Sequence, residues 1–328
     1  GSMNTTVFSF GPLGAKGFAF LNMVQLIGWT SIMIYDAMLA LQELVPLSPM
    51  IWTIAIGALV ILWLFIGLHN TGYIQAIVSI LLLGLTLYMG VHMISQWPSD
   101  SSFMTNGNMS FIAALELSIA MPLSWLPLIS DYTRESKSPF SASLTSATVY
   151  TVTSIIMYTL GLSAAIFGGG NSIITIMMNA GLGLAGLIVI IFSTVTTTFM
   201  DAYSAGVSST TIYKGASSKG VAVIVTIVGT IAAILYPMDD ITEFLYLIGS
   251  VFAPMIAILL ADYFVNRQQV QTLSAYLVRG LIWAVAVGLY HYMLHSESSI
   301  GATLPAFTIA FIVTSIVGFI RKTANALL

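Results

Sequence analysis

The chain alternates between long apolar runs and short polar segments. A helix needs about 20 apolar residues to cross a bilayer core of roughly 30 Å. The runs lack the alternation of period two that marks barrel strands, and a helix satisfies its own backbone inside lipid. We therefore predict an all-α polytopic membrane protein with about ten transmembrane helices. The predicted spans are 18–41, 50–68, 73–95, 111–129, 141–167, 183–213, 220–236, 243–264, 274–294 and 302–320.

Composition supports this fold class. Of the 328 residues, 58% are hydrophobic and 6% are charged, and the mean hydropathy is +0.97. A soluble globular domain carries about 25% charged residues, so a soluble enzyme or a nucleic-acid-binding protein is excluded. Cysteine is absent, which excludes disulfides and a thiolate nucleophile. We expect a single integral membrane domain over residues 1–328, embedded in the lipid bilayer. Residues 1–3 resemble a cloning remnant.

The basic residues lie on one side of this ten-span arrangement. Basic loops face the cytoplasm in most membrane proteins, so both ends of the chain are expected there. The net charge of -3 adds nothing to the argument, because the placement of the charges carries the information. The nine basic residues are Lys16, Arg134, Lys137, Lys214, Lys219, Arg267, Arg279, Arg321 and Lys322.

Polar side chains follow one face of the first span. Asn22, Gln25, Trp29 and Asp36 are spaced by 3, 4 and 7 residues, which places them on the same side of a helix. An indole beside an amide suits a flat heteroaromatic ligand that stacks and is hydrogen-bonded at its edge. The alternative is that Trp29 fills the core and that Asp36 lies at the membrane interface.

The fourth span carries a carboxylate and two prolines. Glu116 sits among small apolar residues, and either a substrate or a hydrogen bond to a neighbouring helix would explain it. Pro122 and Pro127 flank Trp125, and each proline removes a backbone donor. We predict a helix break here, which marks the substrate site in many secondary transporters, whereas a simple kink is the alternative.

The sixth span is rich in hydroxyl groups. Thr196 and Thr197 follow Ser193 by about one turn, and Asp201 comes one turn later. Such hydroxyls usually bond back to a carbonyl of the preceding turn. They could also bind a hard cation such as Na⁺, together with the carbonyl of Ser193, while Asp201 could carry a proton.

Other ionisable side chains receive less weight. Asp262 lies near the predicted cytoplasmic end of the eighth span, and we expect it to be solvated. His291 and His295 have a spacing that permits zinc, but the glutamate of the metalloprotease motif is missing. We expect no metal beyond sodium and no cofactor, with Na⁺ or H⁺ as the coupling ion.

Three segments resemble the nucleobase–cation symport family of cytosine, purine, allantoin and hydantoin permeases. They are Ser9–Gly17 with Asn22–Thr30, then Ser130–Arg134, and the threonine-rich stretch that ends in Asp201–Gly206. The likeness covers nearly the whole chain and is greatest to the family's hydroxymethylpyrimidine transporters. It implies a leucine-transporter-like inverted-repeat fold. The ten spans would then correspond to helices 3–12, and we expect the family's first two helices to be absent from this sequence.

The resemblance also implies roles for individual residues. Trp29 matches the tryptophan that stacks on the substrate ring, and Trp125 is a candidate for the second stacking aromatic. Thr196 and Thr197, with the Ser193 carbonyl, match the sodium ligands. Asp131 and Arg134 belong to the family's signature at the cytoplasmic end of its broken helix. Glu116 has no counterpart in the family pattern, and we assign it to substrate by its chemistry alone.

These observations give a functional hypothesis. We expect an alternating-access symporter in a bacterial cytoplasmic membrane, which carries a pyrimidine such as hydroxymethylpyrimidine or cytosine and is not an enzyme. The alternative is a truncated membrane fragment without transport activity, with a structural or binding role only. The sequence leaves the oligomeric state open.

Overall fold

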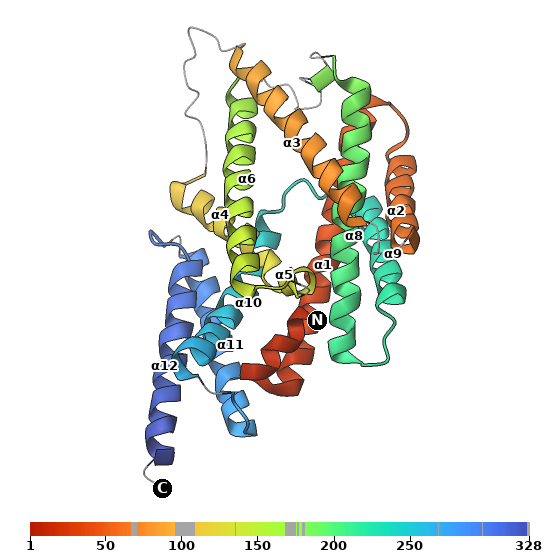
Figure 1. The fold of residues 1–328 in the computed structure, drawn as a ribbon. Helices are drawn as coiled ribbons and strands as arrows, with labels where there is room; N and C mark the ends of the chain where they lie inside the picture. The colour runs from red at the N-terminus through yellow and green to blue at the C-terminus, as the bar shows by residue number, and fades with distance from the viewer. Residues whose placement is uncertain are drawn as a thin grey trace.

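The computed structural model describes residues 1–66, 71–95, 109–134, 136–167, 175, 177–178, 181–267, 269–296 and 298–326. Over these residues the regular structure is helical (Figure 1). The elements are η1 (Ser2–Thr6), α1 (Val7–Leu44), α2 (Pro49–Ile66), α3 (Thr71–Ser95), α4 (Phe111–Trp125), α5 (Ile129–Thr133), α6 (Pro139–Phe167), α8 (Gly183–Ile212), α9 (Ser218–Leu235), α10 (Thr242–Leu260), η2 (Ala261–Asn266), α11 (Leu273–His295) and α12 (Thr303–Ala326).

The all-α prediction is confirmed, and each predicted span overlaps one of these helices. The first span, 18–41, is shorter than α1, and the fourth, 111–129, runs past the end of α4. Among the described residues, eight helices are long and apolar enough to cross a membrane. Two shorter apolar helices, Gln75–Val91 within α3 and Phe111–Trp125, correspond to the third and fourth predicted spans. The agreement is close because in lipid each apolar run must satisfy its own backbone.

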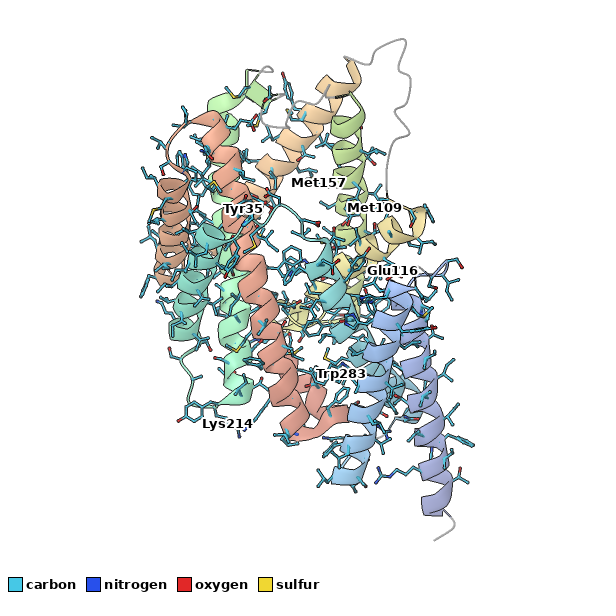
Figure 2. All side chains as sticks on the ribbon, turned by 180° about the vertical axis from the view of Figure 1, so that it is seen from behind. Tyr35, Met109, Glu116, Met157, Lys214 and Trp283 are labelled. Atoms are coloured by element: carbon cyan, nitrogen blue, oxygen red, sulfur yellow. The ribbon has the colours of Figure 1, made fainter. Side chains whose placement is uncertain are left out.

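The helices pack in two groups that meet along α1. In the first, α1 lies against α2, α8 and α9, and in the second, α10 lies against α4, α11 and α12. Figure 1 shows these two groups on opposite sides of the molecule, with α3 reaching across toward α6. The groups are joined where α1 contacts α10 and α11. There, Phe18 meets Trp283 edge to face with ring centroids 5.3 Å apart (Figure 2 labels Trp283).

Helix α1 is much longer than a membrane crossing requires. Gly11 interrupts its first turns with φ 69° and ψ 179°, a conformation that favours glycine, and Pro12 follows. A side chain at position 11 would also collide with the ring of Tyr276 on α11. The remaining helix to Leu44 spans about 50 Å at 1.5 Å per residue, which is longer than a hydrocarbon core of roughly 30 Å.

Close packing around α1 depends on glycines. A Cβ at Gly28 would lie 2.5 Å from the ring of Phe244, and a Cβ at Gly229 would lie 2.6 Å from the Thr30 methyl group. Small residues allow helix backbones to approach closely in a membrane, where packing rather than the hydrophobic effect holds helices together. Gly28 therefore permits α10 to reach the face of α1 that carries Trp29.

Candidate substrate and ion sites

On the polar face of α1, Asn22 and Gln25 are buried, Trp29 is half-buried and Asp36 is exposed. Asn22 donates from Nδ2 to Oγ of Ser208 on α8 at 2.9 Å, and its Oδ1 accepts from Nε2 of Gln25 at 2.7 Å. Gln25 is 3% exposed, and its Nε2 also donates to the backbone carbonyl of Ser124 at 3.0 Å. Asn22 and Gln25 thus connect α1 to both α8 and the end of α4.

Two polar atoms on this face are buried without a hydrogen-bond partner among the described residues. They are Oε1 of Gln25, an acceptor, and Nε1 of Trp29, a donor, and they lie one helical turn apart. The Trp29 ring meets Phe244 of α10 edge to face at a centroid distance of 5.5 Å. A buried unpaired group costs about 1–3 kcal/mol, so such a pair calls for a ligand or another explanation.

The interruption of the fourth span lies beside this face. Helix α4 runs through Pro122 and ends at Trp125, residues 126–128 form a turn, and α5 begins at Ile129. Pro127 lies in the turn, where it has no amide hydrogen to continue the helix. Trp125 is half-buried and packs against a core cluster that includes Leu128 and Phe199. The structure therefore brings Gln25 next to the end of α4.

Glu116 lies in a different place, at the start of α12. The carboxylate is 5% exposed and accepts hydrogen bonds from the backbone N of Thr303 at 2.9 and 3.2 Å. The Thr303 hydroxyl donates to Oε2 at 2.5 Å. A carboxylate at a helix N-terminus satisfies free amide groups and interacts favourably with the helix dipole. Glu116 thus caps α12, and the structure does not unite it with Trp29 and Gln25.

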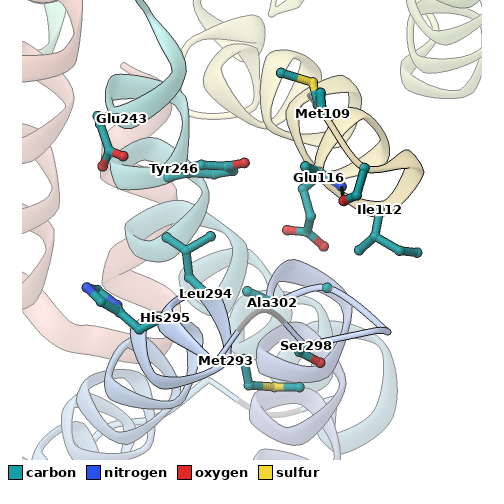
Figure 3. Close-up of a pocket in the computed structure, with 13 residues that line it drawn as sticks. Met109, Ile112, Glu116, Glu243, Tyr246, Met293, Leu294, His295, Ser298 and Ala302 are labelled. Carbon is teal, nitrogen blue, oxygen red and sulfur yellow. Dashed lines mark hydrogen bonds between the residues drawn. The ribbon is translucent and has the colours of Figure 1, made fainter. Parts of the chain in front are cut away.

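A cavity of about 730 Å³ borders Glu116 (Figure 3). Figure 3 shows Glu116 reaching from α4 toward the segment that precedes α12. Glu243 and Tyr246 of α10 and His295 of α11 also line this cavity. Gly301 has φ 75°, and a Cβ there would collide with the Glu116 carboxylate, so a glycine is required for this approach.

The hydroxyl groups of α8 cluster around one carbonyl. Thr196 donates to the carbonyls of Phe192 at 2.8 Å and Ser193 at 3.1 Å, and Thr197 donates to the Ser193 carbonyl at 2.8 Å. This is the back-bonding usual for hydroxyls in transmembrane helices. Both hydroxyl oxygens lie within 3.1 Å of the Ser193 carbonyl oxygen, and each retains lone pairs. Residues from another helix would have to complete a cation site here.

Asp201 follows one turn later on α8. It is 5% exposed, and no described residue donates a hydrogen bond to its carboxylate. Nearby, the Tyr132 hydroxyl donates to the Met200 carbonyl at 2.6 Å and lies 2.8 Å from Oγ of Ser204. These contacts fix α5 against α8 beside a carboxylate that has no protein donor of its own.

The signature residues of α5 lie against the start of the chain. Oδ1 of Asp131 accepts a hydrogen bond from the backbone N of Ser2 at 2.5 Å, and the hydroxyls of Ser2 and Ser130 are 2.7 Å apart. Oδ2 of Asp131 is buried without a partner among the described residues, whereas Arg134 is exposed. The signature therefore holds a helix junction rather than lining the face of Trp29.

The expectation that Asp262 is solvated is wrong. Asp262 is 0% exposed and accepts from Nη2 of Arg279 at 2.8 Å and from Nε at 3.2 Å. Asn266 donates to the same carboxylate at 2.8 Å. Arg279 lies inside α11, within the predicted span 274–294. Asp262 and Arg279 are 17 positions apart and lie on different helices, so the periodicity of one helix could not predict that they pair.

Sequence reasoning missed the partners that define these sites. Ser124, Ser208 and Thr303 are small hydroxyl residues in apolar helices, which are common and give little signal. Phe244 was missed for the same reason, since its ring is one of many. Gly28 beside Trp29 was the available clue, because a glycine in a helix permits close approach of another chain segment.

Comparisons with known proteins agree with this fold. The model of a family described as permeases for cytosine/purines, uracil, thiamine and allantoin matches residues 3–325. Cytosine permease of Escherichia coli strain K12 is 26% identical over 185 residues, which are 55% of this chain and 44% of that permease. The cytosine permease of Escherichia coli O157:H7 gives the same values.

A solved structure shares the fold. It is Mhp1, a nucleobase-cation-symport-1 family transporter, in a closed conformation with bromovinylhydantoin bound. The TM-score is 0.77 at 17% identity, with 98% of this chain and 79% of that chain covered. The family match extends over nearly the whole sequence and the helices follow the same architecture. The chain therefore belongs to the family of membrane permeases for cytosine, purines and related compounds.

Proposed function

We propose that this chain binds a flat pyrimidine, such as cytosine or hydroxymethylpyrimidine, against the α1 face formed by Asn22, Gln25 and Trp29. The observation that carries the proposal is the buried, unpartnered pair of Gln25 Oε1 and Trp29 Nε1. An aminopyrimidine offers an exocyclic amine for the first atom. The Trp29 ring adds a surface for stacking.

The position of this face supports the proposal. Gln25 donates to the Ser124 carbonyl, one residue before α4 ends, so the site lies where a transmembrane helix is interrupted. Discontinuous helices at bilayer depth surround the substrate in many secondary transporters. Trp125 at this end is the candidate second aromatic. The bonds of Glu116 to Thr303 leave it outside the proposed site.

Coupling to a cation completes the proposed mechanism. The Ser193 carbonyl with Thr196 and Thr197 would hold Na⁺, and Asp201 would carry a proton if H⁺ drives transport. Either ion acts by binding one conformation better than the other, which shifts the population toward the state that accepts substrate. The chain then moves substrate by alternating access around the α1 face.

Uptake of radiolabelled cytosine into proteoliposomes tests this function. We expect saturable accumulation that depends on an imposed Na⁺ or pH gradient and is inhibited by unlabelled hydroxymethylpyrimidine. Binding without gradient-driven uptake would leave only a binding role. Loss of both binding and uptake in folded protein would contradict the proposal and favour the inactive-fragment alternative.

Variants of α8 distinguish Na⁺ from H⁺ as the coupling ion. Sodium-driven uptake should fail in Thr197→Val and persist in Thr226→Val, which removes a similarly back-bonded hydroxyl from α9. Proton-driven uptake should fail in Asp201→Asn and persist in Thr197→Val. A gradient response that survives both changes would contradict the assignment of the ion to α8.

A further inference from the structure

A second polar cavity lies between η2, the start of α11 and the end of α12. Its lining residues are far in the sequence from those of the proposed substrate site. The volume of the cavity is about 390 Å³. Two arginines, Arg279 of α11 and Arg321 of α12, face it. The other lining residues are Asn266, Gln269, Val270, Gln271, Thr272 and Gly318. The lining therefore contains two cationic groups and several neutral hydrogen-bonding groups but no carboxylate.

The two arginines have different roles in the cavity. Arg279 is 3% exposed, and its Nε and Nη2 donate hydrogen bonds to the Asp262 carboxylate. Nη1 of Arg279 has no partner among the described residues, so two N–H groups of a buried guanidinium remain unused. Arg321 donates from Nη2 to the Thr272 hydroxyl at 2.6 Å, and no carboxylate among the described residues pairs with it. Among the described residues, one positive charge at the cavity is thus left uncompensated.

The start of α11 adds further donors. Thr272 is the N-cap residue of α11, but its side chain makes no capping hydrogen bond. Its hydroxyl instead accepts from Arg321, which leaves the first amide groups of the helix without a side-chain acceptor. Free amide groups and the helix dipole favour an anion at this position. Two guanidinium groups therefore border one cavity, and Thr272 at the start of α11 also lines it.

We propose that this cavity binds a phosphate group, presented by the headgroup of an anionic phospholipid. Arginine forms short, charge-assisted and often bidentate hydrogen bonds with phosphate oxygens. Large apolar side chains within two residues of Arg279 or Arg321 along the same helices are exposed, namely Leu277 and Leu281 of α11 and Phe319 and Ile320 of α12. They would lie along acyl chains while the headgroup occupies the cavity. Basic pockets between transmembrane helices bind anionic headgroups in other membrane proteins.

The proposal does not depend on the transport function. It concerns a lipid-facing part of α11 and α12, and none of the α1 residues of the proposed substrate site lines this cavity. A failure of cytosine binding would therefore leave it untouched. Occupation of the cavity would join α12 to α11 and η2 through one ligand, and should raise the resistance of these helices to unfolding.

Native mass spectrometry of the full chain in a neutral detergent tests the proposal. Phosphatidylglycerol is titrated as the anionic probe, with phosphatidylcholine as a zwitterionic comparison and inorganic phosphate as a competitor. The decisive variant is Arg321→Gln, and the matched control is Lys322→Gln, which removes the same charge from the next, exposed position. Both positions are near the end of α12, so the fold is expected to survive, and thermal unfolding checks this.

We expect Arg321→Gln to weaken phosphatidylglycerol binding about tenfold, as for the loss of one charge-assisted hydrogen bond, and Lys322→Gln to change it by less than about twofold. Lipid binding that resists competition by inorganic phosphate supports the headgroup. Binding of inorganic phosphate that Arg321→Gln abolishes supports the phosphate site but assigns it to a free anion. Equal losses in the two variants, or equal binding of phosphatidylcholine, would overturn the proposal.

Discussion

Among the described residues, the two helix groups differ in the bonding of their buried carboxylates and amides, although each group also holds buried hydroxyls without a partner, such as Tyr290 and Thr314 in the second group. In the group of α10, α11 and α12, the carboxylates of Glu116 and Asp262 are fully engaged, one on the start of α12 and the other on Arg279 and Asn266. In the group of α1 and α8, Gln25 and Trp29 each leave a buried polar atom without a partner. Satisfied polar groups fix helices to one another, whereas unsatisfied groups at a helix break are suited to a ligand.

Burial alone does not distinguish a structural polar group from one that is free to bind a ligand. Glu116 and Gln25 are almost equally buried, yet only Gln25 keeps an acceptor atom free. In an alternating-access transporter, one part of the molecule must stay rigid while another rearranges around the substrate. The bonded group has the contacts of a scaffold, and the open face of α1 is where we propose that substrate binds.

The largest effect is expected from breaking the scaffold at Asp262. Asp262→Asn removes the charge that compensates buried Arg279, and breaking a buried ion pair on one side costs about 3–5 kcal/mol. We expect a clear fall in the thermal unfolding midpoint of the detergent-solubilised protein. Asp240→Asn, at an exposed site, should change the midpoint little. An unchanged midpoint in Asp262→Asn would show that Arg279 has another source of compensation.

Substitution of Trp29 is expected to lower stability less than substitution of Asp262 does, and to act mainly on substrate binding. Trp29→Ala should remove about 1–3 kcal/mol of substrate binding, the magnitude measured for bases stacked on aromatic rings. Calorimetric titration with cytosine measures this loss. Trp63→Ala is the control, because Trp63 also has a buried, unpartnered Nε1 but lies on α2. Equal losses of affinity in both variants would mean that an unpaired indole does not identify the site.

The smallest effect is expected at Glu116. Glu116→Gln keeps one acceptor for Thr303 but loses the charge at the start of α12, which should lower stability by about 1–2 kcal/mol. Affinities for cytosine and uracil should change by the same factor, because the carboxylate binds a helix rather than the exocyclic amine. A selective loss of cytosine binding would show that Glu116 contacts the substrate, and would contradict the difference proposed between the two regions.

Much of the architecture was predictable from the sequence. The predicted spans 50–68 and 274–294 match α2 and α11 to within two residues at each end, since apolar composition alone marks a helix in lipid. The face of Asn22, Gln25 and Trp29 was also predictable, because it needs only the period of the helix. The role of Glu116 was not, and neither was the burial of Asp262, because each depends on a helix distant in the sequence.

The sequence by itself determined which segments are helical and suited to a membrane, because each helix closes its own backbone hydrogen bonds within a few residues of chain. Only the tertiary structure decided which buried polar atoms are paired. The partners of Gln25, Asn22 and Glu116 are separated from them by 99, 186 and 187 residues. Hydrogen bonds require contact at about 3 Å, and no local pattern specifies which distant helix comes that close.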